Sequence, residues 1–344
     1  MLKINFQDQI GNFFSEENDF YTTITEDGLI KKKASELFEG DLIVGNRSYL
    51  DNLNYAYPID FQSTSFNFIG DITLELCEFL GYLVSYYPCV NQNNIIINEP
   101  KSIDSFYNYF NKIFNINSGF FVFDRKLTIE VDQNIINFLC GLGVNFEDHV
   151  VPSCVLESSN EYKASFLKGF LKNKINFEFN RAYSFQLIDL QKKITKDIQN
   201  IFDHLGIYST AIKKDCFWNL RIGGLSNLKR FSDYIQIEQK NQLDILRNNG
   251  FSFSNISSEA LTKLFLKNTP QEKINSMKKL YDLYEIEQII EFDGKLGRSY
   301  YSQMNGIFDY PVYCVEKIQK ANSITNSFSE ISCCATSTLE TLAK

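Results

Sequence analysis

The groups in this chain best suited to a specific chemistry are basic side chains that could contact phosphates. Residues 151–250 contain 15 Lys and Arg against 10 Asp and Glu, whereas residues 71–150 contain 4 against 10. Proteins that bind nucleic acid are usually basic, because neutralising phosphate groups supplies much of the affinity. The whole chain carries a formal net charge of −8, so this distribution favours phosphate contacts in the second stretch rather than along the entire chain.

The candidate nucleic-acid-binding residues lie in predicted hairpins, a polar turn and a helix. They are Arg125 and Lys126 in the first stretch, and Arg181, Lys213, Lys214, Arg221, Lys229 and Arg230 in the second. Basic side chains of this kind position a protein on nucleic acid by contacting phosphate oxygens. A solvated hairpin and helix surface is the alternative interpretation of the same residues.

The cysteines and histidines show no metal-binding or nucleophile pattern. None of the eight Cys forms a Cys-x-x-Cys pair, and His149 and His204 lie far from any such pair. Zinc sites usually contain closely spaced ligand pairs. Most Cys have apolar neighbours, as Cys140 does, so we expect buried free thiols. We also expect structural histidines, no metal site and no cofactor.

The composition is that of a globular protein, with 44% hydrophobic and 22% charged residues in a chain of 344. No apolar run reaches the roughly 18 residues of a membrane span, and the first residues do not form a signal peptide. We therefore expect a soluble intracellular protein with no membrane partner.

An internal repeat organises the middle of the chain and would position the basic residues. The first half predicts a helix over 74–86, a strand over 94–97, a helix over 101–114, a hairpin over 120–131 and a helix that Asp132 caps. The second half predicts a helix over 161–174, strands over 175–179 and 184–188, a helix over 190–205, a hairpin over 207–222 and a helix over 225–235. Each half has the order helix, strands, helix, hairpin, helix, which indicates an α+β protein with two similar halves.

Residues 80–84 (LGYLV) and 166–171 (FLKGFL) resemble the two signature helices of the LAGLIDADG homing endonucleases. The resemblance extends over about residues 70–250, including Val151-Pro152 before the second motif. It implies a pseudo-two-fold fold of two αββαββα-like halves in one chain, and so a pseudo-symmetric monomer. In that fold the two signature helices pack closely, and small residues such as Gly81 and Gly169 would permit this.

The resemblance also implies a catalytic centre, and this chain departs from it there. In the family, each signature helix ends in an acidic residue, and the two acids hold the divalent metals that cut DNA. Tyr86 stands at the first of these positions and Lys174 at the second. A phenol and an ammonium cannot replace two carboxylates as ligands of Mg²⁺, so we expect neither catalytic residues nor a metal site. Glu178 could supply a carboxylate only after a shift of register. Packing between helices is the favoured interpretation of Tyr86 and Tyr87, over stacking on a base.

The flanking segments resemble an intein or HINT-type domain. The N-terminal half is matched by residues 25–41, and the C-terminal half by residues 311–316 and 321–326. The chemistry of splicing is not matched, because the chain starts at Met1, residues 16–19 lack a Thr-x-x-His motif, and no Asn precedes Cys333. The predicted domains are 1–66 (HINT-like), 67–254 (LAGLIDADG-like), 255–280 (helical connector) and 281–344 (HINT-like part and tail).

The function predicted from these features is that of a catalytically degenerate homing-endonuclease relative. It would bind nucleic acid or serve as a structural subunit of a larger protein complex. One alternative is an active site-specific endonuclease, which would require Mg²⁺. The other is a protein-interaction module that makes no contact with nucleic acid.

Overall fold

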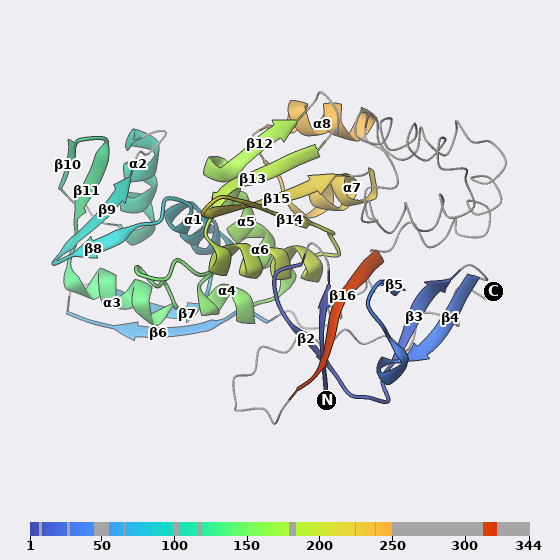
Figure 1. Ribbon diagram of the computed structural model, residues 1–344. Coiled ribbons are helices and arrows are strands. Elements are labelled where there is room, and N and C mark those ends of the chain that lie inside the picture. Colours follow the sequence, from blue (N-terminus) through green and yellow to red (C-terminus); the bar gives the residue numbers. More distant parts are fainter. Residues whose placement is uncertain are drawn as a thin grey trace.

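A computed structural model gives the fold of the chain (Figure 1). It describes residues 1–6, 9–25, 28–44, 55–64, 66–98, 103–115, 119–178, 184–223, 225–237, 239–249 and 312–321. The described part is α+β, with helices packed on several small antiparallel sheets, as the sequence predicts. The predicted connector over 255–280 and all of the predicted HINT-like part and tail over 281–344 except residues 312–321 lie outside the described residues.

A six-stranded sheet joins both ends of the described chain. Its strands are β1 (Leu2–Phe6), β2 (Phe13–Ser15), β3 (Phe20–Thr25), β4 (Gly28–Lys33), β5 (Leu42–Val44) and β16 (Val312–Lys320), in the order β2-β1-β16-β5-β3-β4. Strand β16 therefore lies between β1 and β5, antiparallel to both (Figure 1). Ile4, Phe6, Tyr21 and Val315 are buried in the small core of this sheet. A short 3-10 helix, η1 (Ala34–Glu36), follows β4.

The repeat predicted for the middle of the chain is present. The first half runs α1 (Leu74–Ser85), β8 (Cys89–Asn91), β9 (Asn94–Asn98), α2 (Ile103–Phe114), β10 (Phe120–Phe123), β11 (Lys126–Glu130) and α3 (Gln133–Gly141). The second half runs α5 (Asn160–Lys174), β12 (Ile175–Glu178), β13 (Ser184–Leu190), α6 (Lys192–His204), β14 (Thr210–Lys214), β15 (Phe217–Gly223) and α7 (Leu225–Tyr234). Both halves have the order helix, two strands, helix, two strands, helix.

Each half of the repeat builds one four-stranded antiparallel sheet with the same topology. The strand order is β8-β9-β11-β10 in the first sheet and β12-β13-β15-β14 in the second. Equivalent strands thus occupy equivalent places, which makes the two halves structural copies. Helices α1 and α5 pack against each other between the two halves (Figure 1).

Local sequence explains where several of these helices begin. Thr73 caps α1 by accepting a hydrogen bond from the N–H of Leu76 at 3.1 Å. Asp132 caps α3 through the N–H of Asn134 at 2.8 Å, as the sequence predicts. Such caps satisfy N–H groups that have no partner within the helix.

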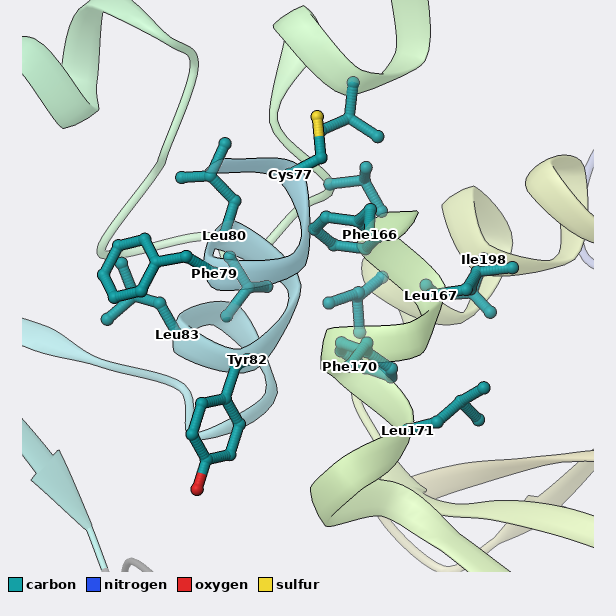
Figure 2. Packing of buried hydrophobic residues seen from close by; sticks show 14 of the residues in the cluster. Cys77, Phe79, Leu80, Tyr82, Leu83, Phe166, Leu167, Phe170, Leu171 and Ile198 are labelled. Atoms are coloured by element: carbon teal, nitrogen blue, oxygen red, sulfur yellow. The ribbon is translucent and has the colours of Figure 1, made fainter. Parts of the chain in front are cut away.

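One large core runs through both halves of the repeat. Phe79 and Leu83 of α1 point away from α5 into the first half, while Leu167 and Leu171 of α5 point toward Ile198 of α6 in the second (Figure 2). The apolar faces of α1 and α5 therefore serve two purposes, each packing on its partner helix and on its own half.

Three features of the fold go beyond or against the sequence prediction. A hairpin of β6 (Pro58–Gln62) and β7 (Asn67–Asp71) packs its phenylalanines on Phe138, and short helices α4 (Ser153–Glu157) and α8 (Lys240–Asn249) are added. Among the five cysteines whose side chains the structure describes, the expectation of buried thiols holds for Cys77 and Cys154. It is wrong for the exposed Cys89, Cys140 and Cys216. Cys140 has apolar sequence neighbours, but its position on α3 faces solvent.

Candidate site at the paired helix ends and sheet faces

Helices α1 and α5 approach so closely that no side chain fits between them at two positions. A Cβ placed on Gly81 would lie 1.9 Å from the carbonyl oxygen of Phe166, and one on Gly169 would lie 1.8 Å from that of Glu78. Both distances are far below a normal contact, so glycine is required by packing at both positions. Gly81 and Gly169 are 88 positions apart, as are Glu78 and Phe166. The two contacts are therefore related by a local two-fold axis that crosses the helix pair.

The same offset makes Tyr86 and Lys174 equivalent positions at the ends of the two helices. Tyr86 is the C-cap of α1 and Lys174 is the last residue of α5. Just before them, Asn173 donates a hydrogen bond to Ser85 Oγ at 3.3 Å, and these two residues are again equivalent. The helix ends thus meet at the local axis.

Tyr86 is a packing residue. It is 5% exposed, and its hydroxyl donates to the hydroxyl of Tyr82 at 3.2 Å. Its ring also packs edge-on against Phe106 of α2, with centroids 5.7 Å apart. The interpretation that this tyrosine fills space beside the helices is confirmed.

Lys174 is held over an aromatic ring from the other helix end. Its Nζ lies 4.3 Å from the ring centroid of Tyr87, a distance typical of a cation–π interaction. The Tyr87 hydroxyl donates to the carbonyl of Asp189 at 3.0 Å and accepts from the N–H of Gln191 at 3.3 Å. Burial raises the pKa of the Tyr87 phenol. The His149 ring, 5.1 Å away, completes this aromatic surface.

An ion-pair cluster lies along the same helix pair. Glu78 of α1 accepts from Lys168 at 2.7 Å and from Lys172 at 2.9 Å, both on α5. Burial acts to raise the pKa of Glu78, but the hydrogen bonds from the two lysines outweigh it and lower the pKa. Sequence reasoning missed this cluster, because the pairing depends on how two helices about 90 residues apart face each other.

The donor groups at the helix ends do not suit a hard divalent metal. The equivalent positions offer a buried phenol and an ammonium, whereas Mg²⁺ takes carboxylate, carbonyl and water oxygens. In the part of the chain that the structure describes, no group of three or more His, Cys, Asp or Glu could hold a metal ion. The side chain of Glu178 lies outside the described set.

Strand register divides the predicted basic residues between two sheet faces. We call the face opposite the packed helices the outer face of each sheet. On the second sheet Arg221 pairs with Thr210 and Gln186, which places it on the outer face together with Lys214. On the first sheet Lys126 pairs with Phe123 and lies on the outer face.

The other predicted binding residues do not share these outer faces. Lys213 pairs with Trp218 and points to the opposite face of β14. Lys229 and Arg230 belong to α7, which packs on the helix-covered face through Phe231 and Phe185, with ring centroids 4.6 Å apart. Arg125 lies in the exposed β10–β11 turn rather than on a face. Arg181 lies outside the described residues.

The outer face of the second sheet carries a layer of hydrogen-bonded polar groups. Arg221 donates from Nε to Ser184 Oγ at 3.0 Å, and Asn219 donates to Gln186 Oε1 at 3.0 Å. This layer was not predicted from the sequence. The sequence pattern that could have predicted it is the alternation of polar and apolar residues along β13 and β15, which puts all four polar residues on one face.

Comparison with known proteins gives weak similarities. No protein-family model matches the chain, and no curated protein matches it. I-DmoI in complex with DNA and Ca matches at 12% identity and TM-score 0.34, over 46% of this chain and 89% of that chain. LAGLIDADG meganuclease I-AabMI bound to uncleaved DNA matches at 11% identity and TM-score 0.35, over 57% of this chain and 99% of that chain. Full-length DUF199/WhiA from Thermatoga maritima matches at 13% identity and TM-score 0.36, over 69% of this chain and 91% of that chain.

Similarities at this level carry no conclusion about activity. The function of this chain must therefore be inferred from the geometry of its own helix ends and sheet faces. None of the described helices is both long and apolar enough to cross a membrane.

Proposed function

We propose that this chain is a LAGLIDADG-type protein that binds nucleic acid and does not cut it. The observation that carries the proposal is which residues stand at the ends of α1 and α5. Glycines bring the helices together on a local two-fold axis, yet the equivalent end positions hold Tyr86, packed among aromatic rings, and Lys174, held over Tyr87. Metal-dependent cleavage would need carboxylates at that point.

Binding to nucleic acid is supported by the second sheet. Arg221 and Lys214 lie on its outer face, where Arg221 is anchored by its hydrogen bond to the buried Ser184, and two such cationic side chains suit phosphate groups. The ammonium of Lys174 adds a positive charge between the sheets, where a metal would otherwise offset phosphate charge. The first sheet contributes Lys126 alone among the predicted basic residues on its outer face. We infer that the second half makes most of the phosphate contacts.

The domain organisation is part of the same proposal. Residues 67–254 form the LAGLIDADG-like unit, to which β6 is joined because the β6–β7 hairpin packs on Phe138. The rest of residues 1–66 forms with residues 281–344 a HINT-like unit into which it is inserted, and a connector over 255–280 joins the two. Pairing of β16 with β1 and β5 supports this arrangement, because strands from before and after the repeat share one sheet. We infer a structural role for this unit, because residues 16–19 lack a Thr-x-x-His motif and no Asn precedes Cys333.

Salt-dependent binding tests the proposal. Fluorescence anisotropy with labelled duplex DNA, from about 50 to 200 mM salt, should give a linear fall of log K with log salt. Replacing a lysine that contacts phosphate should reduce the slope by about 1, and we expect this for Lys214→Gln and Lys126→Gln. Lys193→Gln is the matched control, because Lys193 is also exposed but lies on α6 in an ion pair with Asp148. Slopes that the first two variants leave unchanged would contradict the proposal.

Cleavage requires a separate assay. Supercoiled plasmid and a library of duplex sequences would be incubated with the protein in Mg²⁺ and in Mn²⁺. We expect intact DNA in both metals. Metal-dependent cutting would support the active endonuclease instead, and a complete lack of DNA binding at low salt would support the protein-interaction module.

A further inference from the structure

Strand β10 exposes four consecutive apolar side chains to solvent. Phe120, Phe121, Val122 and Phe123 are all exposed, and Phe123 reaches 78%. Register places Phe121 and Phe123 on the outer face of the first sheet, while Phe120 and Val122 face the helix side. Exposed apolar residues on both faces of one strand are unusual in a soluble monomer and indicate an interaction surface.

The backbone of β10 is also available on its outer side. Among the described strands, β10 pairs with β11 alone and forms the edge of the first sheet. The N–H of Glu130 donates to the carbonyl of Gly119 at 2.9 Å. Because backbone groups alternate in direction along an antiparallel ladder, those of Phe120 and Val122 point away from β11. A further strand could therefore hydrogen-bond at this edge.

The equivalent edge in the second half is protected. Strand β14 occupies the same place in the second sheet, and the positions equivalent to Val122 and Phe123 hold Lys213 and Lys214. Charged residues, lysine above all, are a common means of preventing strands from pairing at an edge. The two halves of the repeat thus differ at this edge, because β14 carries lysines there and β10 does not.

Charges at the two ends of β10 indicate what pairs with it. Gly119 leaves room for Glu130, whose Oε2 lies 3.1 Å from the position of a Cβ at residue 119, so a carboxylate lies at one end of the edge. At the other end the exposed turn carries Asp124 and Arg125 and leads to Lys126, a net positive group. An antiparallel copy of β10 would bring the negative end of each strand beside the positive end of the other.

We propose that β10 pairs antiparallel with β10 of a second copy of this chain, joining two four-stranded sheets into one of eight strands. The pairing is isologous, with the two-fold axis close to Phe121 and Val122, and it replaces the monomer that the resemblance implies. Phenylalanines of both copies then cover each other on the outer face, and Phe120 and Val122 do so on the helix side. The pairing shares Lys126 with the phosphate contacts proposed for the first sheet, whereas the basic outer face of the second sheet, where most of those contacts are proposed, stays uninvolved.

Sedimentation equilibrium of the full chain tests the pairing, with nuclease-treated protein in 0.5 M salt across about 1 to 100 μM. We expect the mass of a dimer. Phe121→Lys should weaken self-association by at least about 100-fold, because two anchor side chains are lost and two like charges meet at the axis. Ile212→Lys on β14 is the matched control, since Ile212 holds the equivalent position, and it should remain dimeric.

Phe123→Lys provides a second variant at the most exposed position, where substitution places least demand on the fold. It should also be monomeric, with an unchanged circular dichroism spectrum. A parent protein that is monomeric at 100 μM would overturn the proposal and leave a strand of a different protein as the occupant. Dimers that both phenylalanine variants retain would equally overturn it.

Discussion

Replacing either helix-contact glycine by alanine should destabilise the protein, although alanine is the better helix former. In Gly81→Ala the new methyl group would lie 1.9 Å from the carbonyl oxygen of Phe166, and in Gly169→Ala it would lie 1.8 Å from that of Glu78. The obstructing atoms belong to helix backbones, so no side-chain rotation relieves the contact. One helix must move by about 1 Å to bring either distance to 3.0 Å.

The cost can be estimated from two opposing terms. Overpacking a well-packed core costs about 1–3 kcal/mol, and a clash with backbone belongs at the upper end, about 3 kcal/mol. Alanine regains about 1 kcal/mol through its higher helix propensity. The net loss is about 2 kcal/mol for each variant. With a urea m-value of about 3 kcal/mol/M, the unfolding midpoint should fall by about 0.7 M.

Urea unfolding followed by fluorescence measures this loss. The chain has a single tryptophan, Trp218, which lies in β15 and packs against the same core. Gly141→Ala is the matched control, because Gly141 ends α3 and a Cβ there meets nothing within 4 Å. The control should be as stable as the parent or up to about 1 kcal/mol more stable.

Unfolding midpoints within about 0.2 M of the parent for both contact variants would refute the close approach of the helices, because that interval corresponds to only about 0.6 kcal/mol. The double variant adds a further check. Because Gly81 and Gly169 act on the same helix pair, separating the helices once relieves both clashes. The free energy of unfolding should therefore fall less in the double variant than the sum of its decreases in the two single variants.

Three further predictions concern single side chains, namely Asp203 of α6, Glu78 of α1 and Tyr86 at the end of α1. Burial raises the pKa of Asp203 from 3.8 to about 8, so the folded state holds a proton that the unfolded state lacks, and stability falls as pH rises between these values. Asp203→Asn should remove that part of the decline, seen as a stability difference from the parent that grows in favour of the variant from about pH 5 to about pH 8. The pKa of Glu78 is lowered instead, so its charged form stabilises the fold and this stabilisation is lost as pH falls. Glu78→Gln should lower thermal stability at neutral pH and much less at acidic pH, unless Lys168 and Lys172 contribute nothing. Tyr86→Phe should cost about 1 kcal/mol, the usual worth of one hydrogen bond, and Tyr86→Ala about 3–5 kcal/mol, the usual cost of emptying a buried aromatic site. Equal losses in urea would show that the ring does not pack.

The sequence determines much of the repeat, because its elements depend on local patterns. Apolar residues at helical spacing define α1, α2 and α6, and Asp132 marks the start of α3. The β10–β11 and β14–β15 hairpins are predicted by short strands around polar turns. The match of two glycine-containing segments predicts a helix pair, and Tyr86 and Lys174 are placed at its ends without any structural information. These features require only neighbours in sequence.

Tertiary structure alone decides which residues share a face or a core. Lys213 and Lys214 are adjacent in sequence but project to opposite faces of β14, because side chains alternate along a strand and register sets which face is outer. The ion pairs of Glu78 and the stacking of Lys174 on Tyr87 join residues about 90 positions apart. Strand β16 similarly joins β1 across most of the chain. Pairings of this kind depend on how whole helices and sheets dock, and docking is settled by the shape of the shared core rather than by any local pattern.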